Sequence, residues 1–231
     1  MKLVDYFNEY NLKTENIKEF EEFKKFLLDY NEHTNLTRIT EEDEFNVKHF
    51  LDSLSIFRTN LIDENKKIID IGAGAGFPGI PLKLYDKTLD ITLLDSLKKR
   101  IDFLNQVIEK FNLKQIEAIH ARAEEIARNP IYREQYDIAI SRAVANLRTL
   151  SEYALGFVKV GGYFISQKGP EYIEEIKDAQ NAIKIMGAEV QETIKVPLPN
   201  DIEHYLIVIK KVKNTNKKYP RGGGKPRKKP L

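Results

Sequence analysis

The stretch Ile68-Ile69-Asp70-Ile71-Gly72-Ala73-Gly74-Ala75-Gly76-Phe77-Pro78-Gly79 decides the fold of this chain. It joins a short apolar run, typical of a buried strand, to a loop that holds four of the twelve glycines in the sequence. Glycines directly after a strand let the backbone turn sharply and approach a ligand closely. Ligands bind at this end of the strands in doubly wound sheets, so the stretch predicts a binding site. A tight turn that binds nothing is the alternative.

The spacing of the glycines distinguishes between two nucleotide cofactors. The dinucleotide motif G-x-G-x-x-G would need a glycine at the position of Phe77. Gly72, Gly74 and Gly76 instead form G-x-G-x-G, with Asp70 two residues before the first glycine. This variant favours S-adenosylmethionine (AdoMet) over NAD. An NAD-dependent oxidoreductase is the alternative function.

Beyond this stretch, short apolar runs alternate with helical periodicity, which is typical of a parallel sheet with helices on both faces. The first five strands are expected at 68–71, 91–94, 117–120, 138–141 and 163–166. Two further runs, 189–196 and 204–209, are expected to form an antiparallel pair at the sheet edge. Apolar residues at steps of four and three predict a helix over 97–111, and another is expected over 171–186.

The N-terminal residues predict a helical cap in front of the sheet. Apolar residues three and four positions apart from Phe20 to Tyr30 predict a helix, which the polar segment 31–37 ends. Thr40 and Asp43 have the spacing of a capping box, and apolar residues from Val47 to Phe57 predict a second buried helix face. We therefore predict three parts, namely a helical cap (1–62), a Rossmann-like core (63–212) and a basic, flexible C-terminal tail (213–231).

Residues at the ends of the second and third strands suit a nucleoside. Asp95 ends the second strand, where an acid can accept hydrogen bonds from the two hydroxyls of a ribose. Asp95 and Ser96 also directly precede a helix, so helix capping is the structural alternative. After the third strand, Ala123 and Glu124 are placed to border an adenine ring, although they also suit the start of a surface helix.

The loop after the fourth strand, Ser141-Arg142-Ala143, restricts the methyl acceptor. Methyltransferases that act on exocyclic amines of bases commonly carry Asn/Asp-Pro-Pro-aromatic here, and this chain does not. The chain has no cysteine, which excludes the covalent route to carbon-5 of pyrimidines. What remains is a ring nitrogen with a free lone pair, such as guanine N7. Arg142 is a candidate for positioning a phosphate, the cofactor carboxylate or the guanine edge, with a salt bridge as the alternative.

Charge is divided unevenly along the chain. The formal net charge is +2, but residues 210–231 contain ten Lys or Arg and no acid, so they carry +10 and the first 209 residues carry −8. A basic segment with several prolines suits contact with a nucleic-acid backbone, and a merely solubilising tail is the alternative. Together with a lysine after the fifth strand, the expected RNA-binding residues are Lys168, Arg221, Lys225, Arg227, Lys228 and Lys229.

Several classes of protein are disfavoured. The four histidines, His33, His49, His120 and His204, lack metal-ligand spacing, so we expect no metal site and structural or exposed roles for them. No apolar run approaches the length that spans a bilayer, and the amino terminus does not look like a signal sequence. The expectation is a soluble cytoplasmic protein that does not bind a membrane.

Several motifs together resemble the RsmG (GidB) family of bacterial small-subunit rRNA guanine-N7 methyltransferases. The matching residues are Asn35-Leu36-Thr37, Asp70 to Gly79, Ser141-Arg142-Ala143, Lys168-Gly169 and the Pro-Arg to Lys-Lys-Pro-Leu end of the tail. The resemblance covers essentially the whole chain. It implies a Rossmann-like, class I AdoMet-dependent fold with a seven-stranded, mostly parallel sheet. The AdoMet contacts that it implies are Gly72, Phe77, Asp95, Ser96, Leu97, Ala123, Glu124 and Arg142.

The same resemblance implies an activity and a partner. The activity is transfer of a methyl group from AdoMet to N7 of guanine 527 in 16S rRNA, by in-line displacement without a covalent intermediate. The partner is 16S rRNA, the small ribosomal subunit or an assembly intermediate of it, and the protein is expected to be a monomer. A non-catalytic rRNA-binding assembly factor that retains an AdoMet pocket is the second alternative.

Overall fold

The centre of the protein is one seven-stranded sheet, in a computed structural model that describes residues 1–64 and 66–231. The strands are β1 (Lys67–Ile71), β2 (Asp90–Asp95), β3 (Ile116–His120), β4 (Tyr136–Arg142), β5 (Val158–Lys168), β6 (Ala188–Pro197) and β7 (Glu203–Lys211). Their order is β3-β2-β1-β4-β5-β7-β6. The pairs among β1 to β5 are parallel, whereas β7 is antiparallel to both β5 and β6.

The sheet confirms the predicted fold class, and each predicted strand lies within an observed one. The last two strands do pair antiparallel, with β6 at the edge and β7 inserted between β6 and β5. The strand order reverses at β1, because β2 lies on one side of it and β4 on the other. In doubly wound sheets a ligand binds at such a reversal, outside the carboxyl ends of the strands.

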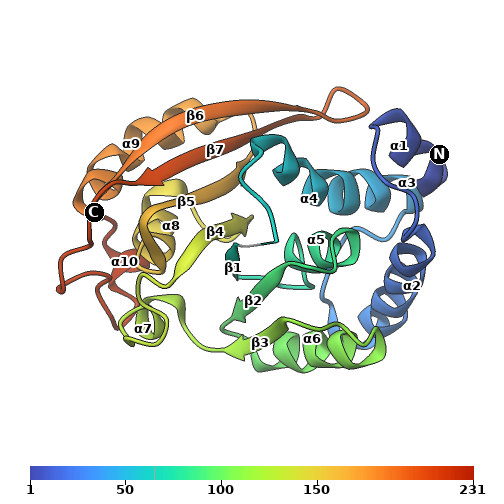
Figure 1. Ribbon diagram of the computed structural model, residues 1–231, viewed down its shortest axis with the longest axis horizontal. Helices are drawn as coiled ribbons and strands as arrows, with labels where there is room; N and C mark the ends of the chain where they lie inside the picture. The colour runs from blue at the N-terminus through green and yellow to red at the C-terminus, as the bar shows by residue number, and fades with distance from the viewer. Residues whose placement is uncertain (65) are drawn as a thin grey trace.

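Helices cover both faces of the sheet, as Figure 1 shows with α2, α4, α5 and α6 on one side and α8 to α10 on the other. The α-helices are α1 (Leu3–Glu9), α2 (Ile17–Thr34), α3 (Glu42–Phe45), α4 (Asp52–Leu54), α5 (Gly79–Tyr85), α6 (Lys98–Lys110), α7 (Ala123–Ile126), α8 (Leu147–Ala154), α9 (Tyr172–Ile185) and α10 (Lys225–Lys228). A π-helix, η1 (Asn46–Leu51), and a 3₁₀-helix, η2 (Ser55–Thr59), flank α4. None of the helices described is long and apolar enough to cross a membrane.

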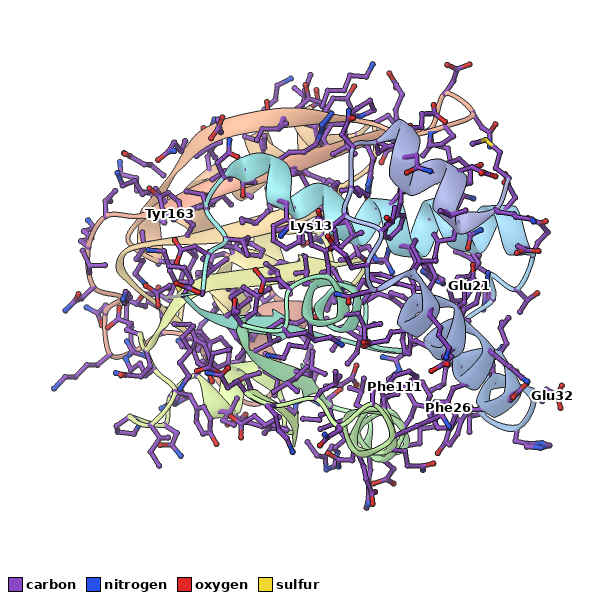
Figure 2. The ribbon with its side chains drawn as sticks, turned by 45° about the vertical axis from the view of Figure 1, so that its right-hand side comes forward. Lys13, Glu21, Phe26, Glu32, Phe111 and Tyr163 are labelled. Carbon is purple, nitrogen blue, oxygen red and sulfur yellow. The ribbon has the colours of Figure 1, made fainter. Side chains whose placement is uncertain are left out.

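Alternate strand residues supply two hydrophobic clusters, one on each face. Ile68 of β1 packs in the cluster that includes the N-terminal helices, whereas Ile69 packs with α8 and α9 on the other face. Phe23 of α2 lies 5.7 Å from Phe77 and 6.3 Å from Phe111, measured between ring centroids. Figure 2 shows Phe26 and Phe111 in the space between α2 and α6. The cap is thereby packed directly on the glycine-rich loop.

The cap differs from the prediction in its second helix. Thr40 does not cap it; the Glu41 carboxylate instead accepts a hydrogen bond from the backbone N–H of Glu44 at 2.8 Å. The helix is also not α-helical throughout, because residues 46–51 form a π-helix. A π-turn inserts one extra residue, which the spacing of apolar residues does not indicate. The helix predicted over Phe20 to Tyr30 is α2, which continues into the polar segment 31–37 and ends at Thr34.

The tail lies differently from the flexible arm that we expected. Arg221 forms an ion pair with Glu152 of α8, with Nη2–Oε2 and Nε–Oε1 distances of 2.7 and 2.9 Å. Pro226 is buried as well, and its carbonyl accepts a hydrogen bond from Oγ1 of Thr149. The Gly223 N–H also donates to Glu125 at 2.7 Å, and Arg148 donates to the carbonyl of Pro230 at 3.1 Å. The tail is therefore held by an ion pair, several hydrogen bonds and a buried proline, none of which produces a periodic apolar pattern. The domain boundaries themselves stay a prediction.

We expect Arg221→Ala to lower the free energy of unfolding by about 3 kcal/mol, because the change leaves the carboxylate of Glu152 buried without its counter-charge. The side chain of Glu152 is only 1% exposed, so water cannot replace the guanidinium. Urea denaturation would measure the difference. Lys225→Ala, at an exposed tail position, is the matched control and should cost less than about 0.5 kcal/mol. Equal costs for the two variants would contradict this account of the tail.

Candidate functional site

A cleft of about 550 Å³ lies where β1, β2 and β4 end, at the reversal of strand order. Nine of the predicted cofactor-binding residues line it, namely Gly72, Gly74, Phe77, Asp95, Ser96, Leu97, Ala123, Glu124 and Arg142. Leu36, Thr37 and His49 of the cap line the cleft too, together with Arg227 of the tail. Its size is typical of pockets for small molecules.

The glycines of the loop have different roles. The backbone N–H of Gly72 donates to the carbonyl of Leu94 at 2.7 Å, with φ at +73°. A Cβ at this position would lie 2.4 Å from Cγ2 of Val144, so the residue has no room for a side chain. Gly76 does not line the cleft, and a Cβ there would meet Cγ1 of Ile80 at 2.6 Å. The loop therefore needs Gly76 for packing, and its predicted contact with the cofactor does not fit this position.

Asp95 joins the glycine-rich loop to the start of α6. Its carboxylate is almost fully buried and accepts hydrogen bonds from the backbone N–H of Gly74 at 3.0 Å and of Leu97 at 2.9 Å. Nη1 of Arg100 donates a third bond at 3.0 Å. A carboxylate can accept about four such bonds, so Asp95 keeps capacity for a donor in the cleft. Asp95 therefore does cap the start of α6, as the alternative to ribose binding predicted, and its carboxylate can still accept a hydrogen bond from a ligand.

Glu124 is the second buried acid of the cleft, with a side chain that is 3% exposed. It accepts a hydrogen bond from Nε of Arg122 at 2.9 Å. Helix α7 begins at Ala123, so these residues do start a helix, as the structural alternative has it. They face the cleft from the β3 side, whereas Arg142 faces it from the β4 side.

Arg142 is held by residues of the cap. Its Nη1 donates to the carbonyl of Lys48 at 2.5 Å and to Oδ2 of Asp52 at 2.8 Å, and its Nη2 donates to Nδ1 of His49 at 3.0 Å. The guanidinium also lies over the ring of Phe77, 5.2 Å from its centroid. An arginine has five N–H groups, so two donors remain for a ligand.

Asp52 is the buried counter-charge of this group. It also accepts hydrogen bonds from Nε2 of Gln167 at 3.0 Å and from Nδ1 of His204. Burial alone would raise the pKa of the Asp52 carboxyl, but the bond from His204 and the charge of Arg142 outweigh it and lower that pKa below its usual value. Asp52 is therefore ionised, and it fixes Arg142 in place.

His49 is neutral and its tautomer is determined. Burial and the charge of Arg142 lower the pKa of His49 to about 3. Because an arginine can only donate, Nδ1 of His49 accepts and Nε2 carries the hydrogen, which it donates to Oγ1 of Thr37 at 3.0 Å. The ring stacks on Phe77 with centroids 4.1 Å apart. Among the described residues, no group of three or more histidine or acidic side chains is arranged to hold a metal ion.

Two of the predicted RNA-binding residues have other partners. Lys168 is buried, and its Nζ donates to Oε2 of Glu175 at 2.7 Å and to the carbonyl of Ala145 at 2.8 Å. Arg221 pairs with Glu152, so neither cation is free to meet a phosphate. The charge of Lys168 neutralises the half-buried Glu175, and the charge of Arg221 neutralises the buried Glu152. The other four predicted residues, Lys225, Arg227, Lys228 and Lys229, are exposed.

Sequence reasoning did not identify His49, Asp52 and Arg100 as site residues. His49 lies in the π-helix, and Asp52, three positions on, is the first residue of α4. Only their common partner, Arg142, shows that they act together. Thr37 belonged to a motif that we noted, but the motif did not indicate a contact. The one available signal was that His49 and Asp52 directly flank the apolar pair Phe50-Leu51 of the predicted buried helix face.

Solved structures of other proteins share this fold. A SAM dependent methyltransferase from Aquifex aeolicus superimposes with a TM-score of 0.57 at 14% identity, covering 78% of this chain and 98% of that one. M. jannaschii TYW2 in complex with AdoMet gives a TM-score of 0.54 at 18% identity, covering 70% and 77%. The fold is thus that of the Rossmann-like AdoMet-dependent methyltransferases.

Sequence relatives define the family. The family described as GidB, rRNA small subunit methyltransferase G, matches residues 16–202. Ribosomal RNA small subunit methyltransferase G of Alkaliphilus oremlandii is 53% identical over 93% of this chain and 90% of its own length, and that of Clostridium novyi is 50% identical over 96% and 91%. This chain belongs to the small-subunit rRNA methyltransferase G family, which confirms the resemblance and leaves the oxidoreductase alternative without support.

We expect the ring of His49 to stay neutral, as the Nε2–H tautomer, from pH 8 down to pH 5, and long-range ¹H–¹⁵N spectra of the histidines would show it. The folded pKa of about 3 lies below the ordinary 6.5, so the unfolded chain binds more protons between these values. The contribution of His49 to stability is therefore complete above pH 6.5 and declines as the pH falls towards 3.

Arg142→Gln should raise the pKa of His49, because it removes the neighbouring positive charge, whereas Arg128→Gln at an exposed position should not. A wild-type ring that titrates near pH 6.5 would contradict the contact between His49 and Arg142.

Proposed function

We propose that this protein binds AdoMet in the cleft and transfers its methyl group to N7 of a guanine in small-subunit rRNA, guanine 527 of 16S rRNA. The family membership supports the class of reaction, and the relatives carry that class in their name. The particular atom and nucleotide are the proposal.

The residues of the cleft fit AdoMet. Asp95 has a buried carboxylate with unused acceptor capacity, which suits the ribose hydroxyls. Ala123 and Glu124 would border the adenine ring, and the lack of a side chain at Gly72 lets the methionine part approach the backbone. The remaining donors of Arg142 would face the carboxylate or the acceptor base.

One observation carries the choice of N7, which is that no side chain described in the cleft is a free base. His49 uses both ring nitrogens, Asp95 is paired with Arg100, and Glu124 is paired with Arg122. An exocyclic amine needs its proton removed, but N7 has a free lone pair and needs only to be placed in line with the methyl group. A cleft without a base therefore suits N7.

When bound, AdoMet supplies a methyl group on a positively charged sulfur. Transfer of that methyl group to N7 would leave the positive charge on the purine and would require no side chain to remove a proton. The side chains of the cleft bind, orient and exclude water in this scheme. Phe77 and His49 form a stacked wall beside Arg142, which limits the positions open to the acceptor base.

The remaining parts of the protein would bring the RNA to the cleft. We propose that the cap (1–62) and the core (63–212) form the two walls, and that the exposed cations of the tail (213–231) contact the RNA backbone. The body carries −8, so productive contact would depend on these local cations. We propose a cytoplasmic monomer that acts on 16S rRNA, a small subunit or an assembly intermediate.

Labelled methyl from AdoMet should appear in small-subunit rRNA as 7-methylguanosine, and Asp95→Ala should weaken AdoMet binding at least tenfold, because the ribose loses a charged acceptor worth about 1.5–3 kcal/mol. Calorimetry would measure the affinity and nucleoside mapping the product. Asp102→Ala, at a surface ion pair on α6, is the control and should bind AdoMet like wild type.

Absence of any N7 mark with intact AdoMet binding would favour the non-catalytic assembly factor. Wild-type affinity in Asp95→Ala would contradict the ribose contact.

Lys228→Ala combined with Lys229→Ala should make RNA binding less dependent on salt. Each lost phosphate contact reduces the slope of log K against log salt by about 0.7 for single-stranded RNA. Filter binding between low and physiological salt would give the slope. Lys18→Ala on α2, on the side of the molecule away from the tail in Figure 1, should leave it unchanged. An unchanged slope in the double variant would count against a role of the tail in RNA binding.

A further inference from the structure

The hydroxyl hydrogen of Thr37 has no hydrogen-bond acceptor among the described residues. Its oxygen accepts from Nε2 of His49 at 3.0 Å and from the backbone N–H of Ile39 at 3.1 Å. A hydroxyl has two lone pairs and one hydrogen, so both acceptor positions are occupied and only the hydrogen remains. No acceptor is recorded for it among the described residues, and Thr37 lines the cleft.

The direction of these bonds is fixed by the residues behind Thr37. Asp52 binds Arg142, Arg142 can only donate to Nδ1 of His49, and His49 must then donate from Nε2 to Thr37. Protonation of His49 would break this order, but its pKa of about 3 prevents that at neutral pH. The chain of four groups therefore leaves Thr37 as a donor and excludes it as an acceptor.

Thr37 lies on the side of the cleft opposite to the expected adenosine site. The sheet order places Asp95, at the end of β2, on one side of β1, and Arg142, at the end of β4, on the other. Thr37 and His49 join the cleft at the Arg142 side, through the contact of His49 with Arg142. This is the side that remains for an acceptor base.

We propose that the hydroxyl of Thr37 donates a hydrogen bond to O6 of the target guanine and so selects guanine over adenine. O6 lies beside N7 on the same edge of guanine, and both are acceptors, whereas adenine presents an amino donor beside its N7. A donor fixed at Thr37 matches guanine and opposes adenine. The inference rests on the proposed function and names the residue that reads the base.

The free donors of Arg142 do not make the same distinction as sharply. Arg142 has two N–H groups left, which also suit a phosphate or a carboxylate. The Thr37 hydroxyl is uncharged and single, so it suits a neutral carbonyl oxygen. An adenine amine facing Thr37 would leave two donors opposed, and such unpaired groups are costly when water is excluded.

The test compares bases at the target position of the RNA in labelled methyl transfer by the full chain. The substrates carry guanine, 2-aminopurine, which keeps N7 but lacks O6, or inosine, which keeps both N7 and O6. Wild type should prefer guanine and inosine over 2-aminopurine by about tenfold or more in kcat/KM. In Thr37→Val the guanine and inosine rates should fall about tenfold while the 2-aminopurine rate stays, so that the preference disappears. Thr37→Ser keeps a hydroxyl and should keep the preference.

A merely structural role of Thr37 would lower all three rates together and preserve their ratio, which would overturn the inference. The wild-type comparison of inosine with 2-aminopurine needs no variant, and equal rates for these two would overturn it as well, even if Thr37→Val failed to fold. Absence of transfer to any RNA by wild type, with AdoMet bound, would overturn the proposed function and this inference with it.

Discussion

The buried ion pair between Arg142 and Asp52 is the interaction on which the site depends. It joins the end of β4 to the cap, and it places a positive charge, on a side chain that is 13% exposed, beside the glycine-rich loop. Charges in such a position persist only when partners satisfy them, and loss of one partner leaves the other uncompensated. His49 and Phe77 then take their positions from the guanidinium, one by a hydrogen bond and the other by packing beneath it.

The hydrogen bonds of Asp95 stabilise the other side of the cleft. The carboxylate of Asp95 accepts hydrogen bonds from the glycine-rich loop, the start of α6 and Arg100 at once, so it fixes the loop against the start of α6. The aromatic contacts of Phe23 pack the cap against this arrangement. The cleft is therefore shaped before any ligand enters, and binding need not order the loop, which reduces its entropic cost.

The features that the sequence predicted are those that depend on local pattern. Strand positions follow from apolar runs, and Asp95 follows from its place at the end of one of them. Asp52 and His49 could not be predicted, because their role comes from Arg142, some 90 residues away in the chain. The partners of Lys168 and Arg221, Glu175 and Glu152, could not be predicted for the same reason, since the sequence around a cation does not show which acid pairs with it in the folded protein. Their charge alone led to the prediction of RNA contact, whereas in the folded protein both residues form ion pairs with acidic side chains.

The π-helix in the cap constrains the length of the chain as well as its composition. Each residue of an α-helix turns the chain by about 100°, and a π-turn adds one residue to the usual turn. Removal of Phe50 or Leu51 would restore α-helical winding between His49 and Asp52 and rotate His49 and everything before it relative to Asp52. His49 would then leave the face of Phe77, although every remaining side chain was unchanged. Evolution can therefore exchange residues in this segment more readily than it can insert or delete one.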